Sequence, residues 1–185
     1  MREALAAEDD LCLCLSRGQL SPEVRNRAQA LLGTPLRWDR LLQRAYEHQV
    51  YPLVHRSLRI LEFYGVPPGA RAKLTAAFRA NTLRNAFLRR ELVRVLRLLG
   101  AAGVPVIPLK GVTLAESLFG DTAYRVCSDI DIFVPAGETL RARRLLLAEG
   151  HTSPFSEEFF LNHQFHTSAD CSLLPKSSPH FSLRN

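Results

Sequence analysis

The sequence has no long apolar run, because none of its hydrophobic stretches reaches the roughly 20 residues that a membrane-spanning helix needs. It also lacks the pattern of a secretory signal. Acidic residues, including Glu8, Asp9 and Asp10, precede only a short apolar stretch, whereas a signal peptide has a basic segment followed by a long apolar one. We therefore expect a cytoplasmic protein without a membrane partner.

Cysteine is scarce. The chain contains Cys12, Cys14, Cys127 and Cys171, and their spacing matches neither the paired Cys-x-x-Cys pattern of zinc sites nor a dense disulfide framework. Free thiols are the expectation for a cytoplasmic chain. The histidines His151, His163 and His166 lie near one another in the sequence, but this part of the chain has little periodicity and predicts no metal site.

The composition that remains is that of an ordinary globular protein, with 46% hydrophobic and 23% charged residues. A length of 185 residues allows one domain, or a helical domain joined to a compact α/β one. The net charge of +6 comes mostly from arginine, which suits an anionic partner such as a nucleotide or a nucleic acid. Arginine-rich chains are also typical of GC-rich genomes, so the charge alone selects no partner.

The first hundred residues have helical periodicity. Ser21-Pro22-Glu23 is a typical helix start, with Ser as the cap, Pro in the first helical position and Glu near the positive end. Gly33 is the expected stop of that helix. The other helices that we expect here cover residues 3–16, 38–49, 52–63 and 70–99.

The longest of these segments, residues 70–99, is amphipathic. Its apolar residues recur three or four positions apart, and they are Leu74, Ala77, Phe78, Leu83, Phe87, Leu88, Leu92, Val95, Leu96 and Leu99. The opposite face carries Arg71, Lys73, Arg79, Arg84, Arg89, Arg90, Arg94 and Arg97. A basic face of this kind is the ordinary solvated surface of a packed helix, and the alternative is a surface that binds phosphates.

The pattern changes after Gly100. Residues 104–109 read as a short buried strand near a sheet edge, because Pro105 and Pro108 cannot donate backbone hydrogen bonds. Residues 112–118 predict a helix, 128–134 a second strand and 139–148 a further helix. Residues 157–165 have a weaker helical pattern, and residues 167–185 predict no regular structure.

The segment from 109 to 134 carries the chemistry. If residues 128–134 form a strand, Asp129 and Asp131 project to the same face with Cα atoms about 7 Å apart. Mg²⁺ prefers oxygen ligands and is commonly held by one or two carboxylates together with substrate phosphates. This pair is therefore a candidate metal site and the candidate catalytic centre.

The residues around the pair suit a phosphate group. Gly111 lets the backbone approach an anion closely, and the N–H groups that open the following helix attract negative charge. Lys110 adds a positive charge, and Arg125 adds a planar guanidinium with several donors. With Ser128, these residues are the candidate nucleotide-binding and phosphate-binding set.

The order strand, Lys-Gly, short helix, Arg, Ser-Asp-x-Asp, helix, Gly resembles the uncharacterised, bacterial-type nucleotidyltransferase family of the polymerase-β-like superfamily. The resemblance covers residues 38–151, and His151 stands where the family usually has an aromatic residue. It implies an α+β fold. The expected parts are a helical region over residues 1–99, a small mixed-sheet nucleotidyltransferase-like core over 100–166 that is incomplete at its C-terminus, and an irregular or disordered tail over 167–185.

The resemblance also implies an activity, namely transfer of a nucleoside monophosphate from an NTP such as ATP to an acceptor with two Mg²⁺ or Mn²⁺ ions. The acceptor stays open between a small molecule, a protein and an RNA end. The family usually supplies a third carboxylate from an acidic-x-His-aromatic stretch, which is missing here. Asp170, the only acidic residue after Glu158, is the remaining candidate for this third metal ligand. Two alternatives follow, an impaired or truncated member that binds nucleotide or a protein partner, and a basic helical module that binds nucleic acid.

Overall fold

The computed structural model describes residues 5–154 and 156–158. The chain divides into two compact units. Among the described residues, the helical unit comprises 5–89 and 110–127, and the sheet unit comprises 90–109, 128–154 and 156–158. The predicted helix over residues 157–165 lies largely outside the described residues. The predicted irregular tail over 167–185 lies entirely outside them.

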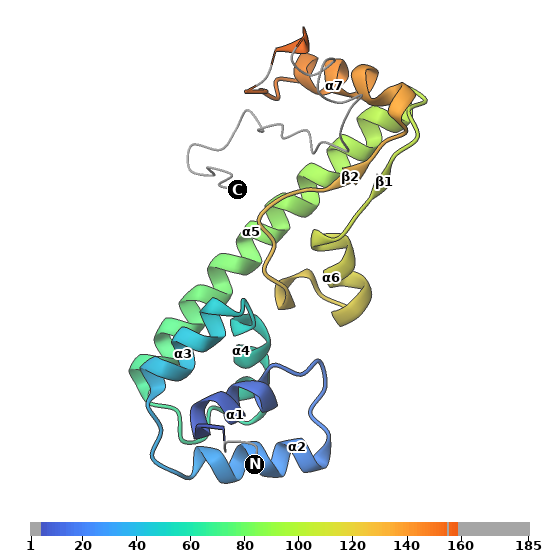
Figure 1. The fold of residues 1–185 in the computed structure, drawn as a ribbon. Helices are drawn as coiled ribbons and strands as arrows, with labels where there is room; N and C mark the ends of the chain where they lie inside the picture. The colour runs from blue at the N-terminus through green and yellow to red at the C-terminus, as the bar shows by residue number, and fades with distance from the viewer. Residues whose placement is uncertain (1–4, 155, 159–185) are drawn as a thin grey trace. The chain divides into compact units, whose positions relative to one another are not determined.

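The helical unit begins with four helices and the first part of a fifth (Figure 1). They are α1 (Ala7–Leu15), α2 (Pro22–Leu32), α3 (Trp38–Glu47), α4 (Tyr51–Ile60) and α5 (Pro68–Ala101). Later in the chain, α6 (Gly111–Phe119) and the 3₁₀ turn η1 (Thr122–Tyr124) complete this unit. The predicted order of helices is confirmed, with ends that differ by a few residues.

Local chemistry explains where α2 begins and ends. The backbone N–H of Val24 donates to the Ser21 hydroxyl at 3.4 Å, and Pro22 occupies the first turn, where its missing N–H costs nothing. Gly33 follows the last helical residue, as the sequence predicts. The turn before α5 depends on Gly65, which has a φ of +69°; a Cβ there would lie 2.7 Å from the backbone oxygen of Leu32.

Leucines from α1, α3 and α4 form the core of the helical unit. Leu11, Leu15, Leu41 and Leu58 are fully buried, and Leu74 of α5 packs in the same cluster. Burying such a side chain contributes roughly 1.5–3 kcal/mol, so this cluster is the main stabilising feature of the unit.

The helix α5 departs from its predicted apolar stripe at three positions. Leu83 was expected on the apolar face, but it is 73% exposed. Asn81 and Asn85, in contrast, are 1% and 0% exposed. They follow Leu74 and Phe78 and precede Leu88 and Leu92 at helical spacing, so two buried amides occupy positions where the pattern would place apolar side chains.

The sheet unit contains the end of α5, the strands β1 (Ile107–Pro108) and β2 (Ile132–Phe133), the 3₁₀ turn η2 (Ala136–Glu138) and α7 (Thr139–Ala148). The strands are antiparallel, with Ile107 opposite Phe133 and Pro108 opposite Ile132. The predicted α+β class with a helical N-terminal region is therefore confirmed.

The core of the sheet unit is small. Val95 and Leu99 of α5 pack with Val104 and with Ala142 and Leu146 of α7. The expectation of a buried strand over residues 104–109 was wrong in extent. Only two residues form the strand, and Ile107 and Leu109 are 59% and 44% exposed, while Val104 is 2% exposed.

Two other expectations concern single features of the chain. Among the described residues, no helix is both long enough and apolar enough to cross a membrane. Cys12, Cys14 and Cys127 are buried, and burial raises the pKa of the Cys12 and Cys14 thiols. Cys171 lies outside the described residues.

Candidate functional site

The two candidate metal ligands lie directly before β2 in the sheet unit. Ser128 and Asp129 are exposed and Asp131 is half-buried. The backbone N–H of Leu109 donates to the backbone carbonyl of Asp131 at 2.9 Å, which continues the β1–β2 pairing by one hydrogen bond. The backbone of Asp131 is thus tied to the segment that follows β1.

The predicted strand over 128–134 is shorter in the structure. Only Ile132 and Phe133 belong to it, so Asp129 and Asp131 stand ahead of the strand rather than within it. Both strands have only two residues, and beyond them the pairing extends by the hydrogen bond from the Leu109 N–H to the Asp131 carbonyl. Strand alternation therefore does not establish that the two carboxylates share a face.

The Lys-Gly segment opens α6 in the helical unit. Lys110 is exposed and precedes the helix, and Gly111 is its first residue. Gly111 is buried and has a φ of +57°, a left-handed conformation that glycine adopts without steric cost. The first N–H groups of α6 have no partners within the helix itself, as at every helix start, and this is the general basis for anion binding there.

Arg125 follows η1, and side-chain hydrogen bonds hold this turn at both ends. The Asp121 carboxylate accepts a hydrogen bond from the Ala123 N–H at 2.8 Å and so caps the turn. Asn81 and Asn85 donate to backbone carbonyls within residues 122–125. Arg125 is half-buried, and its Nε is buried without a hydrogen-bond partner among the described residues.

The candidate residues thus fall into two groups. Lys110, Gly111 and Arg125 belong to the helical unit, whereas Ser128, Asp129 and Asp131 belong to the sheet unit. Asp170, the candidate third ligand, lies outside the described residues.

Sequence reasoning missed Asn81 and Asn85. The signal was available, because an asparagine in the apolar stripe of an amphipathic helix has to find hydrogen-bond partners when it is buried. The sequence could not show which partners these are, since the carbonyls lie about 40 residues further along the chain.

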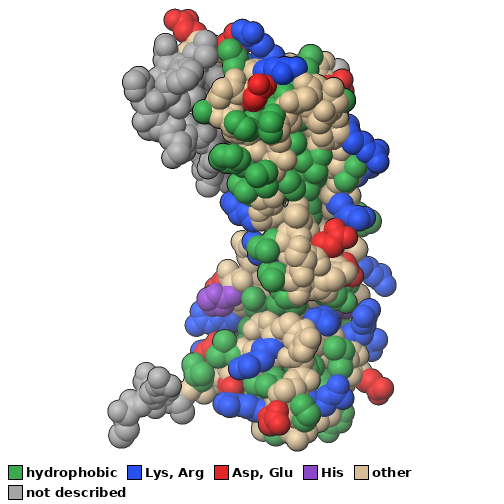
Figure 2. All heavy atoms as spheres, turned by 90° about the vertical axis from the view of Figure 1, so that its right-hand side faces the viewer, with side chains coloured by type: hydrophobic (Ala, Val, Ile, Leu, Met, Phe, Trp, Pro, Cys, Tyr) green, Lys and Arg blue, Asp and Glu red, His purple; other side chains and the backbone are tan. Residues whose placement is uncertain are grey.

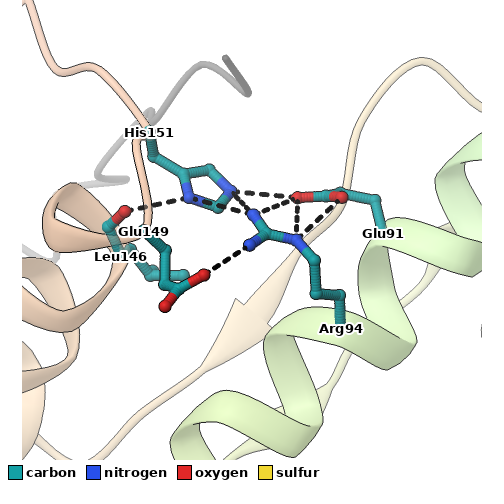
Figure 3. Close-up of polar contacts among 5 residues, drawn as sticks. All are labelled: Glu91, Arg94, Leu146, Glu149 and His151. Carbon is teal, nitrogen blue, oxygen red and sulfur yellow. Dashed lines mark hydrogen bonds and ion pairs between the residues drawn. The ribbon is translucent and has the colours of Figure 1, made fainter. Parts of the chain in front are cut away.

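A second polar cluster lies in the sheet unit and includes His151 (Figure 3). The guanidinium of Arg94 donates to both carboxylate oxygens of Glu91 at 2.8–3.2 Å, and it reaches Glu149 at 3.1 Å. Nε2 of His151 lies 3.1 Å from Glu91, and its Nδ1 lies 3.0 Å from the Leu146 carbonyl oxygen. The hydrogen bonds from Arg94 are the main reason why the pKa of the Glu91 carboxyl lies below its usual value of 4.5.

The described residues contain no group of three or more His, Cys, Asp or Glu side chains arranged to hold a metal ion. The donor chemistry at 129–131 nevertheless fits a hard divalent cation. Two carboxylates supply oxygen ligands, and Mg²⁺ completes its coordination with substrate phosphates and water. Two carboxylates suit a metal ion that is bound together with a nucleotide, rather than one that is enclosed by protein ligands alone.

A family model described as an uncharacterised nucleotidyltransferase matches residues 34–176 of the chain. The match covers most of the sequence, including Lys110, Arg125 and both candidate carboxylates, and the chain belongs to this family. The family resemblance seen in the sequence is thereby confirmed. No curated protein and no solved structure matches the chain.

Proposed function

We propose that the chain transfers a nucleoside monophosphate from an NTP to a hydroxyl or phosphate group of an acceptor, in the cytoplasm. The observation that carries the proposal is the family match over residues 34–176, within which the Ser128-Asp129-x-Asp131 motif leads into β2. Membership indicates nucleotidyl transfer as the class of reaction and an NTP as the substrate class.

The proposed roles follow from the chemistry of each side chain. Asp129 and Asp131 bind Mg²⁺ or Mn²⁺ together with the triphosphate. Lys110, the Gly111 backbone, Ser128 and Arg125 bind phosphate oxygens. Lys110 is exposed and Arg125 is only half-buried, so both are cations that an anionic ligand can reach.

The reaction forms a bond between an acceptor oxygen and the α-phosphorus and breaks the bond between that phosphorus and the α–β bridging oxygen. Pyrophosphate leaves, and the acceptor proton passes to solvent. Two divalent ions, when bound, lower the negative charge on the reacting phosphates and activate the acceptor oxygen. The protein side chains position the triphosphate and stabilise the charge that develops on it.

The test is to incubate the protein with each α-labelled NTP and Mg²⁺, and to compare wild type with Asp129→Ala and Asp131→Ala. We expect label transfer or pyrophosphate release by wild type and at least about a hundredfold loss in either variant, the usual scale for losing an electrostatic group of the centre. Asp39→Ala is the matched control, because the Asp39 side chain is 95% exposed. Equal, metal-independent signals in all four proteins would rule out the enzyme.

The alternative is a member that binds nucleotide or a protein partner without turnover. It is motivated by the sequence, in which no acidic-x-His-aromatic stretch follows the aspartate pair. Equilibrium dialysis with NTP and Mg²⁺ separates the two, since the alternative predicts binding without pyrophosphate release. Asp170→Ala adds a second comparison. Loss of activity in that variant, with NTP binding retained, would assign Asp170 as the third ligand.

A basic nucleic-acid-binding helix is the weaker alternative. Several members of the predicted basic face have acidic partners within their own unit: Lys73 pairs with Asp39, Arg89 with Glu116 and Arg94 with Glu91. On the face that Figure 2 shows, basic side chains are dispersed among other groups rather than gathered in one patch. RNA binding that falls steeply with salt concentration would favour this alternative.

A further inference from the structure

Asn81 and Asn85 of α5 are buried amides one helical turn apart in the helical unit. They are 1% and 0% exposed and occupy the apolar stripe of the helix. Burying an amide without hydrogen bonds costs roughly 1–3 kcal/mol, so side chains in such positions need specific partners.

Their partners are all backbone carbonyls of one short segment. Nδ2 of Asn81 donates to the carbonyl of Ala123 at 2.9 Å and to that of Arg125 at 3.0 Å. Nδ2 of Asn85 donates to the carbonyl of Thr122 at 2.6 Å and to that of Arg125 at 2.7 Å. Both donors of each amide are used, and the Arg125 carbonyl accepts from both residues.

This arrangement fixes the backbone at Arg125. The carboxylate of Asp121 caps the start of the same turn, so the segment is held at its first residue and again at its last. Arg125 loses backbone freedom before any ligand binds. A residue that is already ordered gives up less conformational entropy on binding, and its guanidinium therefore binds a phosphate more tightly.

We propose that Asn81 and Asn85 are positioning residues that hold the backbone at Arg125 for contact with the nucleotide triphosphate. The inference rests on the proposed function for the role of Arg125, but the hydrogen bonds themselves do not. The two parts are tested separately.

The first test follows the backbone without any nucleotide. Asn81→Asp and Asn85→Asp keep the side-chain shape and remove the N–H donors, and Asn85→Leu restores the apolar stripe in case a buried carboxylate unfolds the protein. Limited trypsin digestion under native conditions reports cleavage after Arg125 and, as an internal reference, after Arg44 of α3, whose ion pairs are with Asp9 and Glu47. Asn26→Asp is the matched control, because Asn26 is exposed on α2.

We expect cleavage after Arg125 to rise about tenfold in the Asn81 and Asn85 variants, with little change after Arg44, because opening is local. Asn26→Asp should leave both rates unchanged. Equal increases at Arg125 and Arg44 would mean that the asparagines support the whole unit, and an unchanged rate at Arg125 would mean that they do not hold the turn. Either result overturns the inference.

The second test measures the dissociation constants of ATP, GTP, CTP and UTP with Mg²⁺ in a double-mutant cycle. Asn85→Leu should weaken binding about tenfold in the wild-type background and less than about twofold in Arg125→Ala, because the asparagine acts through Arg125. Equal effects in both backgrounds would overturn the positioning role.

A wild type that binds none of the four nucleotides would overturn the proposed function, and the positioning role with it. The digestion result would still decide whether the asparagines hold the turn, so the two failures are distinguishable.

Discussion

His55 is a buried imidazole in the helical unit, and its surroundings oppose protonation. It is 6% exposed, and its ring stacks on Phe78 with ring centroids 4.2 Å apart. Burial, followed by the positive charges of Arg59, Arg71 and Arg79, lowers its pKa from 6.5 to about 4. The folded protein therefore keeps this ring neutral under conditions in which the unfolded chain protonates it.

The sign of the pH effect follows from proton uptake. Above pH 6.5 neither state is protonated at His55, and the group contributes no pH dependence. As the pH falls below 6.5, His55 of the unfolded chain binds a proton, whereas His55 of the folded chain stays neutral until about pH 4. We therefore predict that stability is lost through this window, by up to about 3 kcal/mol from this group.

The measurement is the free energy of urea unfolding between pH 7.5 and 4.5 for wild type and His55→Phe. The phenylalanine variant retains the stacking surface but has no proton to bind. The stability of wild type relative to this variant should decline as the pH falls through 6.5. A difference that stays constant across the range would contradict the prediction.

Contiguous motifs are the residues that sequence reasoning finds most readily. Lys110-Gly111 and Ser128-Asp129-x-Asp131 are recognisable because the spacing within each is local, and the family match includes both. Asn81 and Asn85 are different, since only the folded chain brings their amides to carbonyls about 40 residues away. Their roles, and those of the motif residues, stay predictions until they are tested.

At the scale of elements, the cluster in Figure 3 joins the end of α7 to α5 within the sheet unit. The carboxylate of Glu91 is its centre, because it accepts from Arg94 and lies against His151. The side chain of Glu91 is 11% exposed, whereas that of Glu149, the other partner of Arg94, is 49% exposed. The two acids therefore make a matched pair of buried and exposed partners.

We predict that Glu91→Gln lowers the free energy of unfolding by about 2 kcal/mol at pH 7, because it removes charge-assisted hydrogen bonds from a buried site. Glu149→Gln should cost less than about 1 kcal/mol, since an exposed ion pair is screened by solvent. Urea unfolding of both variants provides the comparison. Equal losses in the two variants would mean that burial does not set the strength of these pairs.

The pH dependence adds a second readout on Glu91. Its folded pKa lies below 4.5, so the unfolded chain takes up the proton first as the solution is acidified. The stabilisation is therefore complete above pH 4.5 and is lost as the pH falls below that value. The stability difference between wild type and Glu91→Gln should shrink in this range. A difference that does not shrink would assign the effect to packing instead.

Helices were more predictable than strands. Each long helix repeats its apolar pattern over several turns, and Thr139–Ala148 was predicted with the same ends as α7. The strands were predicted as six or seven residues and have two each, because pairing depends on a partner elsewhere in the chain. The prolines near β1 indicated a strand at a sheet edge, but they did not indicate how many of its residues pair with β2.

At the scale of the whole molecule, the sequence predicts a division near residue 99, and this division stays a prediction. The compact units of the structure are not divided at one point of the sequence, since residues 110–127 belong to the same unit as the first helices. Periodicity along the chain cannot report this, because the grouping rests on contacts between distant residues such as Asn85 and Thr122.

The two units have separate hydrophobic clusters, and this leads to a prediction about cooperativity. Leu58 belongs to the cluster of the helical unit and Leu146 to that of the sheet unit, and the two clusters share no residue. A buried Leu→Ala change costs about 2–5 kcal/mol. Opening free energies in native proteins differ between cooperative segments, so each change should act mainly on its own unit.

Native-state hydrogen exchange measures this directly. Leu58→Ala should lower protection in α1, α3, α4 and residues 68–89 of α5, with little change in α7. Leu146→Ala should lower it in α7 and residues 90–101 of α5, with little change in α1. A single cooperative core would instead lose protection in all these helices by the same amount in both variants, because every slow amide would then exchange through the same global unfolding.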